Sequence, residues 1–429
     1  MTDHEPPTRQ WDPQGGLRAT SGLGVASSGF FAAAVGFVAL LLGARYLTID
    51  ANARFNVFWS ALFLVFGILS GLAVETTRSI ASQEALAEDR PAPGKTVTAQ
   101  RLGLVAMLIV LVLVGATLPM WRSAVPTMTG HDGLLLCVAL WLGILGYTGQ
   151  SVAWGALAGA GEWKFYALVT FTESAVRLVL VAVTAVAGWG VVGLAFATII
   201  AEYAWLVIVV LSKTVRRSLT KRGDVPVALL TRRILLAMVG FGASTVLLVG
   251  FPWLIGLTTA DSVILGAAPL MLAISLTRAP LVVPIYAFYN VAISYLTRSN
   301  RSRLRALPFM LGAVFVVGVL GGALAWAVGP WLLGLVGPDY VLPGRTLAGL
   351  TFGAACLAAV MITGILCQSS ARYGHYLVGW LVAVGIAVAT LLSGLSLATR
   401  VILALVIAPL GGMMLHVFFI MRQSRHDAG

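Results

Sequence analysis

Charged residues are scarce in this chain of 429 residues. Only 10% are Asp, Glu, Lys or Arg, and 59% are hydrophobic, whereas ordinary soluble domains carry roughly a quarter charged residues. A water-soluble globule does not fit that ratio. Because each membrane span takes about 20 residues, twelve spans would use most of the chain and leave no room for a large nucleotide-binding or secreted catalytic domain.

Motifs of enzymatic chemistry are also absent. The cysteines number only three, and Cys137, Cys356 and Cys367 lie in apolar runs without CxxC spacing, so we interpret them as small buried apolar residues. The five histidines are scattered without metal-ligand spacing, and there is no GxxxxGK[ST], GxSxG or HExxH. We therefore predict a protein that is not an enzyme and that has no cofactor and no bound metal.

Long apolar runs predict an all-α polytopic membrane protein with about twelve transmembrane helices. Runs of this length exceed the roughly ten-residue strands of membrane barrels, and helices satisfy their own backbone hydrogen bonds. The predicted spans are 20–44, 54–76, 102–121, 133–158, 165–187, 190–212, 230–251, 262–296, 306–329, 346–369, 374–395 and 399–421.

The formal net charge is +12, and its distribution indicates a topology. With both termini inside, 21 Lys and Arg residues fall on the cytoplasmic side and 5 on the other, as the positive-inside rule expects. The excess therefore favours membrane orientation over nucleic-acid binding, and it also suits anionic lipid headgroups. Residues 1–18 are rich in proline and lack an apolar core, which predicts a disordered cytoplasmic leader in place of a signal peptide.

A basic segment divides the chain into two halves of six spans. It reads KTVRRSLTKRGDVPVALLTRR from Lys213 to Arg233, and parallel six-helix repeats are a common transporter plan. The predicted organisation is a leader at 1–18, an N-lobe at 19–212, a linker at 213–229, a C-lobe at 230–421 and a cytoplasmic tail at 422–429.

Four ionisable residues lie well inside predicted spans, namely Glu173, Arg177, Glu202 and Arg278. Such groups are expensive in hydrocarbon, so they normally face a bundle interior or an aqueous cavity. Glu173 and Arg177 are four residues apart and can form an ion pair on one helical face, which is either structural or cavity-lining. Glu202 has no basic partner in its own span. It must be protonated, pair with another helix or face water, and it is a candidate coupling carboxylate.

Arg278 stands just before Pro280 and Pro284, which should bend or break its span. A guanidinium beside a broken helix is typical of an anion site and matches phosphate well. The alternative is a simple kink, with the arginine bonded to carbonyl groups or to Glu202. Glu75 and Arg78 end the second span, as a cytoplasmic gate or as a solvated helix end.

Several stretches together resemble one family. They are Gly43–Leu47 followed by Phe55–Phe58, Gly159–Ala167 running into Glu173–Arg177, and Thr277–Leu281. These stretches are similar to polysaccharide-biosynthesis flippases, which move lipid-linked oligosaccharides and belong to the multidrug/oligosaccharidyl-lipid/polysaccharide exporter superfamily. Some members have fourteen spans, whereas this chain supports twelve.

The resemblance implies two six-helix lobes around a central cavity that opens alternately to each side. It implies a polyprenyl-(pyro)phosphate-linked sugar as substrate, with Arg177 and Arg278 on the phosphate and Glu173 and Glu202 as counter-charges or proton carriers. It further implies the bacterial cytoplasmic membrane as location and membrane lipids, glycosyltransferases or a polymerase of the same pathway as partners.

Three other functions stay open. A multidrug or small-molecule antiporter has the same architecture. A polytopic glycosyltransferase that uses a lipid-phosphate donor would need acids in an outward loop, where Asp50 stands alone. A structural scaffold is the third. The sequence does not identify the sugar, the lipid carrier, the driving ion or the oligomeric state.

Overall fold

The computed structural model describes residues 19–86, 96–124, 130–298, 302–369 and 373–426. The predicted leader at 1–18 and the last three residues of the predicted tail lie outside this part. Within it the chain is helical, apart from short connections and one isolated bridge between Thr98 and Arg222.

The described residues of the first half of the chain form eight helices. They are α1 (Ala19–Tyr46), α2 (Ile49–Leu86), α3 (Ala99–Ala124), α4 (Gly130–Gly159), α5 (Trp163–Val186), α6 (Gly190–Ala201), α7 (Ala204–Leu211) and α8 (Lys213–Leu219). The second half contains α9 (Val227–Leu248), α10 (Phe251–Thr258), α11 (Asp261–Ile264), η2 (Leu265–Ala267), α12 (Ala268–Arg298), α13 (Ser302–Gly334), α14 (Gly344–Ser369), α15 (Tyr373–Leu391) and α16 (Leu397–His426).

The predicted fold class is confirmed, and the chain is a multi-pass membrane protein. Ten helical segments of the described residues are long and apolar enough to cross a membrane, and two shorter apolar helical stretches lie at Ala99–Leu113 and Ala268–Val282. The span predicted at 190–212 consists of α6 and α7 with a break at Glu202 and Tyr203. The span predicted at 230–251 is α9, and a further helix, α10, follows it after a break.

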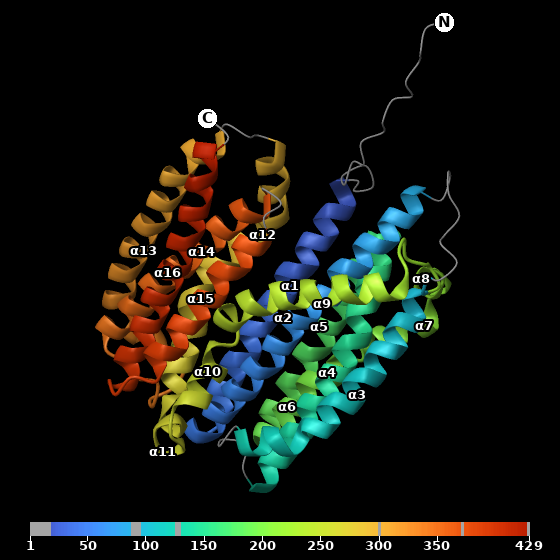
Figure 1. Cartoon of the computed structure of the whole chain (residues 1–429). Helices are drawn as coiled ribbons and strands as arrows, with labels where there is room; N and C mark the ends of the chain where they lie inside the picture. Colours follow the sequence, from blue (N-terminus) through green and yellow to red (C-terminus); the bar gives the residue numbers. More distant parts are fainter. Residues whose placement is uncertain (1–18, 87–95, 125–129, 299–301, 370–372, 427–429) are drawn as a thin grey trace, which may run out of the picture.

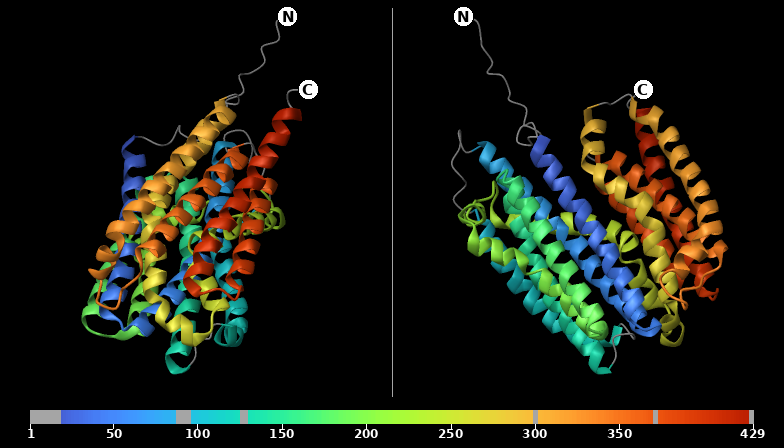
Figure 2. Two further views of the ribbon diagram at one scale, coloured as in Figure 1. Left: turned by 90° about the vertical axis from the view of Figure 1, so that its left-hand side faces the viewer. Right: turned by 180° about the vertical axis from the view of Figure 1, so that it is seen from behind.

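The helices form two lobes that converge toward one end of the molecule (Figure 1; Figure 2). In the N-lobe, α2 packs against α4 and α1 against α5, and in the C-lobe α14 contacts α12, α13 and α16. The start of α1, the end of α2 and the end of α16 lie at the same end of the molecule, which we call the terminal face (Figure 1). The start of α2 lies at the opposite face.

Helix α9 packs mainly against α2 of the N-lobe, although it follows the linker, and it also contacts α15. Glycine makes the close approach possible. A Cβ atom at Gly71 would collide with the backbone of Ala237 and Met238, and one at Gly67 would collide with the Thr245 side chain. The two helices therefore meet almost backbone to backbone, as small residues permit in membrane helices.

The linker is fastened to the end of α2. The Ser79 hydroxyl donates a hydrogen bond of 2.7 Å to Asp224 Oδ1, and Arg78 Nη1 lies 3.4 Å from Asp224 Oδ2. Lys221 Nζ lies 2.7 Å from Glu84 Oε2. These contacts explain why α9 starts beside α2.

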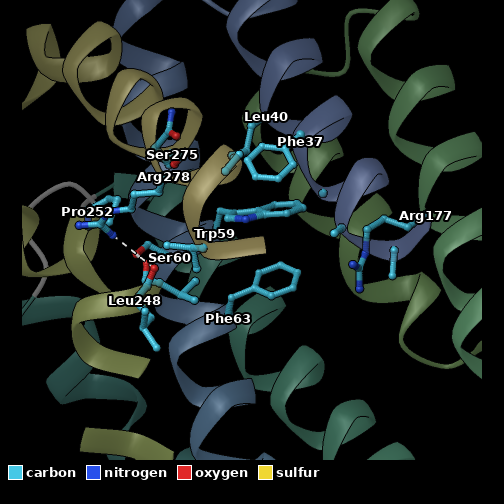
Figure 3. Close-up of a pocket in the computed structure, with 17 residues that line it drawn as sticks. Phe37, Leu40, Trp59, Ser60, Phe63, Arg177, Leu248, Pro252, Ser275 and Arg278 are labelled. Carbon is cyan, nitrogen blue, oxygen red and sulfur yellow. Dashed lines mark hydrogen bonds between the residues drawn. The ribbon is translucent and has the colours of Figure 1, made fainter. Parts of the chain in front are cut away.

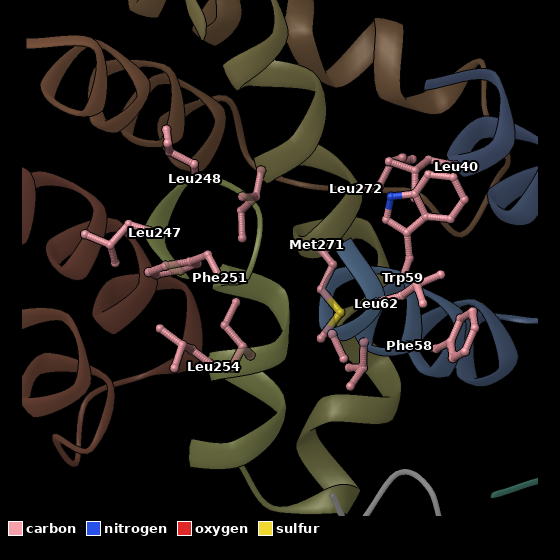
Figure 4. Packing of buried hydrophobic residues seen from close by; sticks show 14 of the residues in the cluster. Leu40, Phe58, Trp59, Leu62, Leu247, Leu248, Phe251, Leu254, Met271 and Leu272 are labelled. Atoms are coloured by element: carbon pink, nitrogen blue, oxygen red, sulfur yellow. The ribbon is translucent and has the colours of Figure 1, made fainter. Parts of the chain in front are cut away.

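A continuous apolar core joins the lobes away from the terminal face. Phe58 and Leu62 of α2, Phe251 of α10 and Met271 of α12 are buried in one cluster (Figure 4). Because this cluster includes side chains of both halves, it holds the two lobes together below the cavity described next.

Candidate functional site

A cavity of about 280 Å³ lies between the two lobes (Figure 3). The N-lobe contributes residues of α1, α2 and α5, and the C-lobe contributes the α9–α10 junction and α12. The lining residues are Ala32, Ala33, Gly36, Phe37, Leu40, Asn56, Trp59, Ser60, Phe63, Arg177, Leu248, Val249, Pro252, Ser275, Arg278, Ala279 and Val282. Both arginines predicted to bind phosphate therefore line the same cavity, one from each lobe.

Arg278 reaches the broken end of α9. Its Nη1 donates to the carbonyl oxygens of Leu247 at 3.0 Å and Leu248 at 3.3 Å, which are carbonyl groups that a helix end leaves without partners. Its guanidinium lies over the Phe251 ring, 5.2 Å from the centroid. Its Nε and Nη2 are buried and have no hydrogen-bond partner among the described residues.

The broken helix beside Arg278 is not the one that the prolines predicted. Helix α12 runs continuously from Ala268 to Arg298, through Pro280, and the break lies at Val249 and Gly250 in the neighbouring segment. Ser60 of α2 satisfies backbone groups at this break. Its hydroxyl donates a hydrogen bond of 2.6 Å to the Val249 carbonyl oxygen and accepts one of 3.3 Å from the Trp253 N–H. Of the two alternative partners considered for Arg278, carbonyl groups and Glu202, the structure has the carbonyl groups, and Glu202 pairs with Arg177.

Arg177 forms ion pairs with both Glu173 and Glu202. The three side chains are at most 6% exposed, and Ser174 adds a hydrogen bond of 3.1 Å to Glu173 Oε2. The predicted pair on α5 is thus present, and a carboxylate from the α6–α7 break joins it. With all three groups ionised, this triad carries one net negative charge.

An aromatic wall separates the two arginines (Figure 3). Trp59 stacks on Phe63 with centroids 4.5 Å apart, and Phe63 contacts Phe66, which stacks on Tyr147. The Arg177 guanidinium lies over the Phe63 ring at 5.2 Å. Sequence reasoning missed this wall, because aromatic residues at helical spacing are typical of ordinary packing.

A polar contact joins the lobes at the opposite face. Asn52, near the start of α2, donates from Nδ2 to the Tyr340 hydroxyl at 2.5 Å. Tyr340 lies in the connection between α13 and α14 and is buried, and burial raises the pKa of Tyr340 to about 12. The phenol therefore stays neutral at physiological pH. Sequence reasoning missed this contact, whose partners are 288 residues apart.

Glu75 and Arg78 lie outside the cavity lining. They form an ion pair of 2.6 Å at the end of α2, and Arg78 also contacts Asp224 of the linker. Of the two predicted gate residues, Arg78 thus contacts the linker directly and Glu75 pairs with Arg78.

Comparison with known proteins finds relatives that match nearly the whole chain. No family model matches the chain. Uncharacterized protein Rv1510 of Mycobacterium tuberculosis is 32% identical over 419 residues, which cover 96% of this chain and 94% of the relative. Uncharacterized protein Rv3630 of the same organism is 32% identical over 412 residues, which cover 95% of this chain and 94% of the relative. The chain belongs to the family of these mycobacterial proteins.

Solved structures show the fold of the same superfamily that the sequence resembles. An inward-facing MATE family multidrug resistance transporter of the MOP superfamily has a TM-score of 0.70 at 16% identity, with 96% of this chain and 99% of that chain covered. An outward-facing multidrug resistance MATE transporter of the same superfamily has a TM-score of 0.59. A MOP superfamily transporter from Pyrococcus furiosus, described as having reverse polarity of its binding pocket, gives 0.62 at 17% identity. The chain therefore has the fold of two six-helix lobes around a central cavity.

Proposed function

We propose that this family member moves a polyprenyl-(pyro)phosphate-linked sugar or oligosaccharide from the cytoplasmic to the outer leaflet by alternating access, for cell-envelope polysaccharide assembly. The observation that carries the proposal is Arg278 in the lining of the inter-lobe cavity, whose buried Nε and Nη2 atoms have no hydrogen-bond partner among the described residues. Guanidinium groups bind phosphate oxygens with parallel, charge-assisted hydrogen bonds.

The polarity of the cavity supports an anionic substrate. Its described lining residues include two arginines and no aspartate or glutamate. Glu173 and Glu202 are bonded to Arg177, whereas Arg278 has no carboxylate partner among the ion pairs of the described residues. Arg278 is therefore the uncompensated charge that a phosphate would neutralise.

The arrangement of the lobes suits loading from the cytoplasm. The Asn52–Tyr340 contact and the apolar core close the opposite face, and the TM-score is higher for the inward-facing MATE structure than for the outward-facing one. If the basic terminal face is cytoplasmic, the cavity would receive the sugar phosphate there. The prenyl chain could stay in lipid between the lobes.

The triad offers a means of coupling. Two carboxylates compete for one guanidinium, so protonation of either carboxylate would balance the charge and loosen the hold on Arg177. Arg177 could then turn toward the substrate phosphate. Glu173 and Glu202 would act as proton carriers, and transport would depend on pH.

A multidrug antiporter is the second candidate. The aromatic wall of Trp59 and Phe63 would suit a flat apolar ligand or a cation, and two structures that share the fold are described as multidrug resistance transporters. Drug efflux by the purified protein, together with unchanged movement of lipid-linked sugar, would favour this function.

Vesicles containing the purified protein test the proposal. A fluorescent polyprenyl-phosphate sugar on the inner leaflet should become accessible to a membrane-impermeant quencher, and Arg278→Gln should reduce the rate at least about tenfold, the loss of one charge-assisted contact. Arg400→Gln is the matched control. Arg400 also donates to a helix-end carbonyl, that of Leu391 at 2.8 Å, and lies outside the cavity. Unchanged accessibility with folded wild-type protein would overturn the proposal.

A further inference from the structure

A second cavity, of about 390 Å³, lies in the N-lobe between α3, α4, α7 and α8. We call it the α3–α7 groove. It is lined by Ala99, Gln100, Gly103, Leu104, Met107, Gly149, Val152, Trp205, Leu206, Val209, Arg216, Leu219 and Thr220. None of these residues belongs to the inter-lobe cavity, so a ligand here would be a separate one.

The walls of the α3–α7 groove carry exposed apolar side chains. Leu104 of α3 and Leu206 of α7 are exposed apolar side chains, and their neighbours Leu108 and Val207 are exposed as well. Both helices belong to predicted membrane spans. If these spans lie in the bilayer, the body of the groove opens to lipid, and an alkyl chain suits its apolar walls.

The mouth of the groove, at the terminal face, is polar and basic. Arg216 of α8 is exposed, but its Nη1 donates to the carbonyl oxygens of Val209 at 3.0 Å and Val210 at 2.5 Å. These bonds fix the guanidinium at the end of α7, beside the groove lining. Gln100 and Thr220 add neutral polar groups at the same mouth.

Other exposed charges on α3 and α8 have the same sign. Arg101 follows Gln100 on α3, and Lys213 and Arg217 are exposed on α8. No aspartate or glutamate is among the described lining residues of the groove. Inside the groove, Trp205 is buried, and its indole N–H has no hydrogen-bond partner among the described residues.

We propose that the α3–α7 groove binds one anionic phospholipid, with an acyl chain between α3 and α7 and the phosphate at Arg216. An alkyl wall below a fixed guanidinium matches a phospholipid in both parts, and basic clusters at the cytoplasmic surface attract anionic headgroups. The inference does not depend on the transported substrate.

A lipid in the groove would also brace the linker between the lobes. The backbone N–H of Ala99 donates to the Lys221 carbonyl at 3.0 Å, and that of Gly223 donates to the Val97 carbonyl at 3.3 Å. The start of α3 and the linker are thus already hydrogen-bonded to each other. A phospholipid held by both α3 and α8 would add a contact across the same junction.

Native mass spectrometry of the full chain, released from detergent with added lipid, tests the proposal. The wild type should retain one phosphatidylglycerol about fivefold more than one phosphatidylcholine, the ratio given by about 1 kcal/mol for a basic residue near a headgroup. Arg216→Gln should abolish the preference. Arg232→Gln removes an exposed arginine of α9 outside the groove and should leave the preference intact.

A second variant tests the alkyl chain without changing charge. A Cβ atom at Gly103 would lie 3.5 Å from Val152 Cγ1, an ordinary contact, and the rest of a leucine side chain would take up space in the groove. Size exclusion checks that Gly103→Leu is folded before its lipid is measured. This variant should lose retention of both lipids. Equal retention of both lipids by the wild type, equal losses in Arg216→Gln and Arg232→Gln, full retention in Gly103→Leu, or displacement of the lipid by inorganic phosphate alone would each overturn the proposal.

Discussion

The charge balance of the triad makes a sharp prediction about stability. Replacing Arg177 with Met keeps much of the side-chain volume but leaves Glu173 and Glu202 buried without their cation. Removing one partner of a buried ion pair costs about 3–5 kcal/mol. Replacing Glu202 with Gln has the opposite consequence, because Arg177 and Glu173 remain as a balanced pair, and we expect a change within about 1 kcal/mol.

Thermal unfolding in detergent, followed by the fraction of monodisperse protein on size exclusion, measures the difference. Arg177→Met should lower the midpoint by several degrees relative to the wild type, and Glu202→Gln should stay near it. Arg400→Met controls for the loss of an arginine that donates to a helix-end carbonyl. If Glu202→Gln destabilises the protein as much as Arg177→Met, the triad has no surplus carboxylate and the coupling argument fails.

Three further changes test the packing, the face opposite the termini and the linker. Gly71→Ala should separate α2 from α9 and reduce the yield of folded protein. Gly29 has open space around it, so Gly29→Ala should leave the yield unchanged. Equal yields of the two variants would contradict the tight contact between α2 and α9. Tyr340→Phe leaves Asn52 without its partner and should lower the free energy of unfolding by about 1–3 kcal/mol. It should also increase labelling, from the opposite face, of a cysteine introduced in the cavity. Unchanged labelling would argue against closure at that face. Asp224→Asn weakens a partly exposed ion pair, so its unfolding midpoint should fall by the equivalent of at most about 1 kcal/mol; a larger drop would mean that the linker attachment is a main source of stability.

The membrane fold could be predicted from the sequence because its rules are local. A run of apolar residues of sufficient length forms a span wherever it occurs, so twelve predicted spans correspond to helices of the structure. The breaks at Glu202 and at Val249 could not be predicted. Each depends on groups from other helices, such as Ser60 of α2, which satisfies the backbone after α9.

The buried ionisable residues and the pair of Glu173 with Arg177 could be predicted from the sequence, but the contact of this pair with Glu202 could not. The cost of an ion in hydrocarbon identified Glu173, Arg177, Glu202 and Arg278 from single positions. Which charges meet between different helices is a non-local property, and the sequence left the partner of Glu202 open, whereas the structure pairs it with Arg177. The proline pattern in α12 indicated a broken helix near Arg278, yet the break occurs in the adjacent segment.

A structure of the protein bound to a polyprenyl-phosphate sugar tests the central claim most directly. The account predicts phosphate density in the inter-lobe cavity, with oxygen atoms about 2.7–2.9 Å from the Nε and Nη2 atoms of Arg278 that lack partners here. The sugar should lie inside the cavity and the prenyl chain in lipid. A phosphate bound elsewhere, with Arg278 still bonded only to the end of α9, would contradict the account.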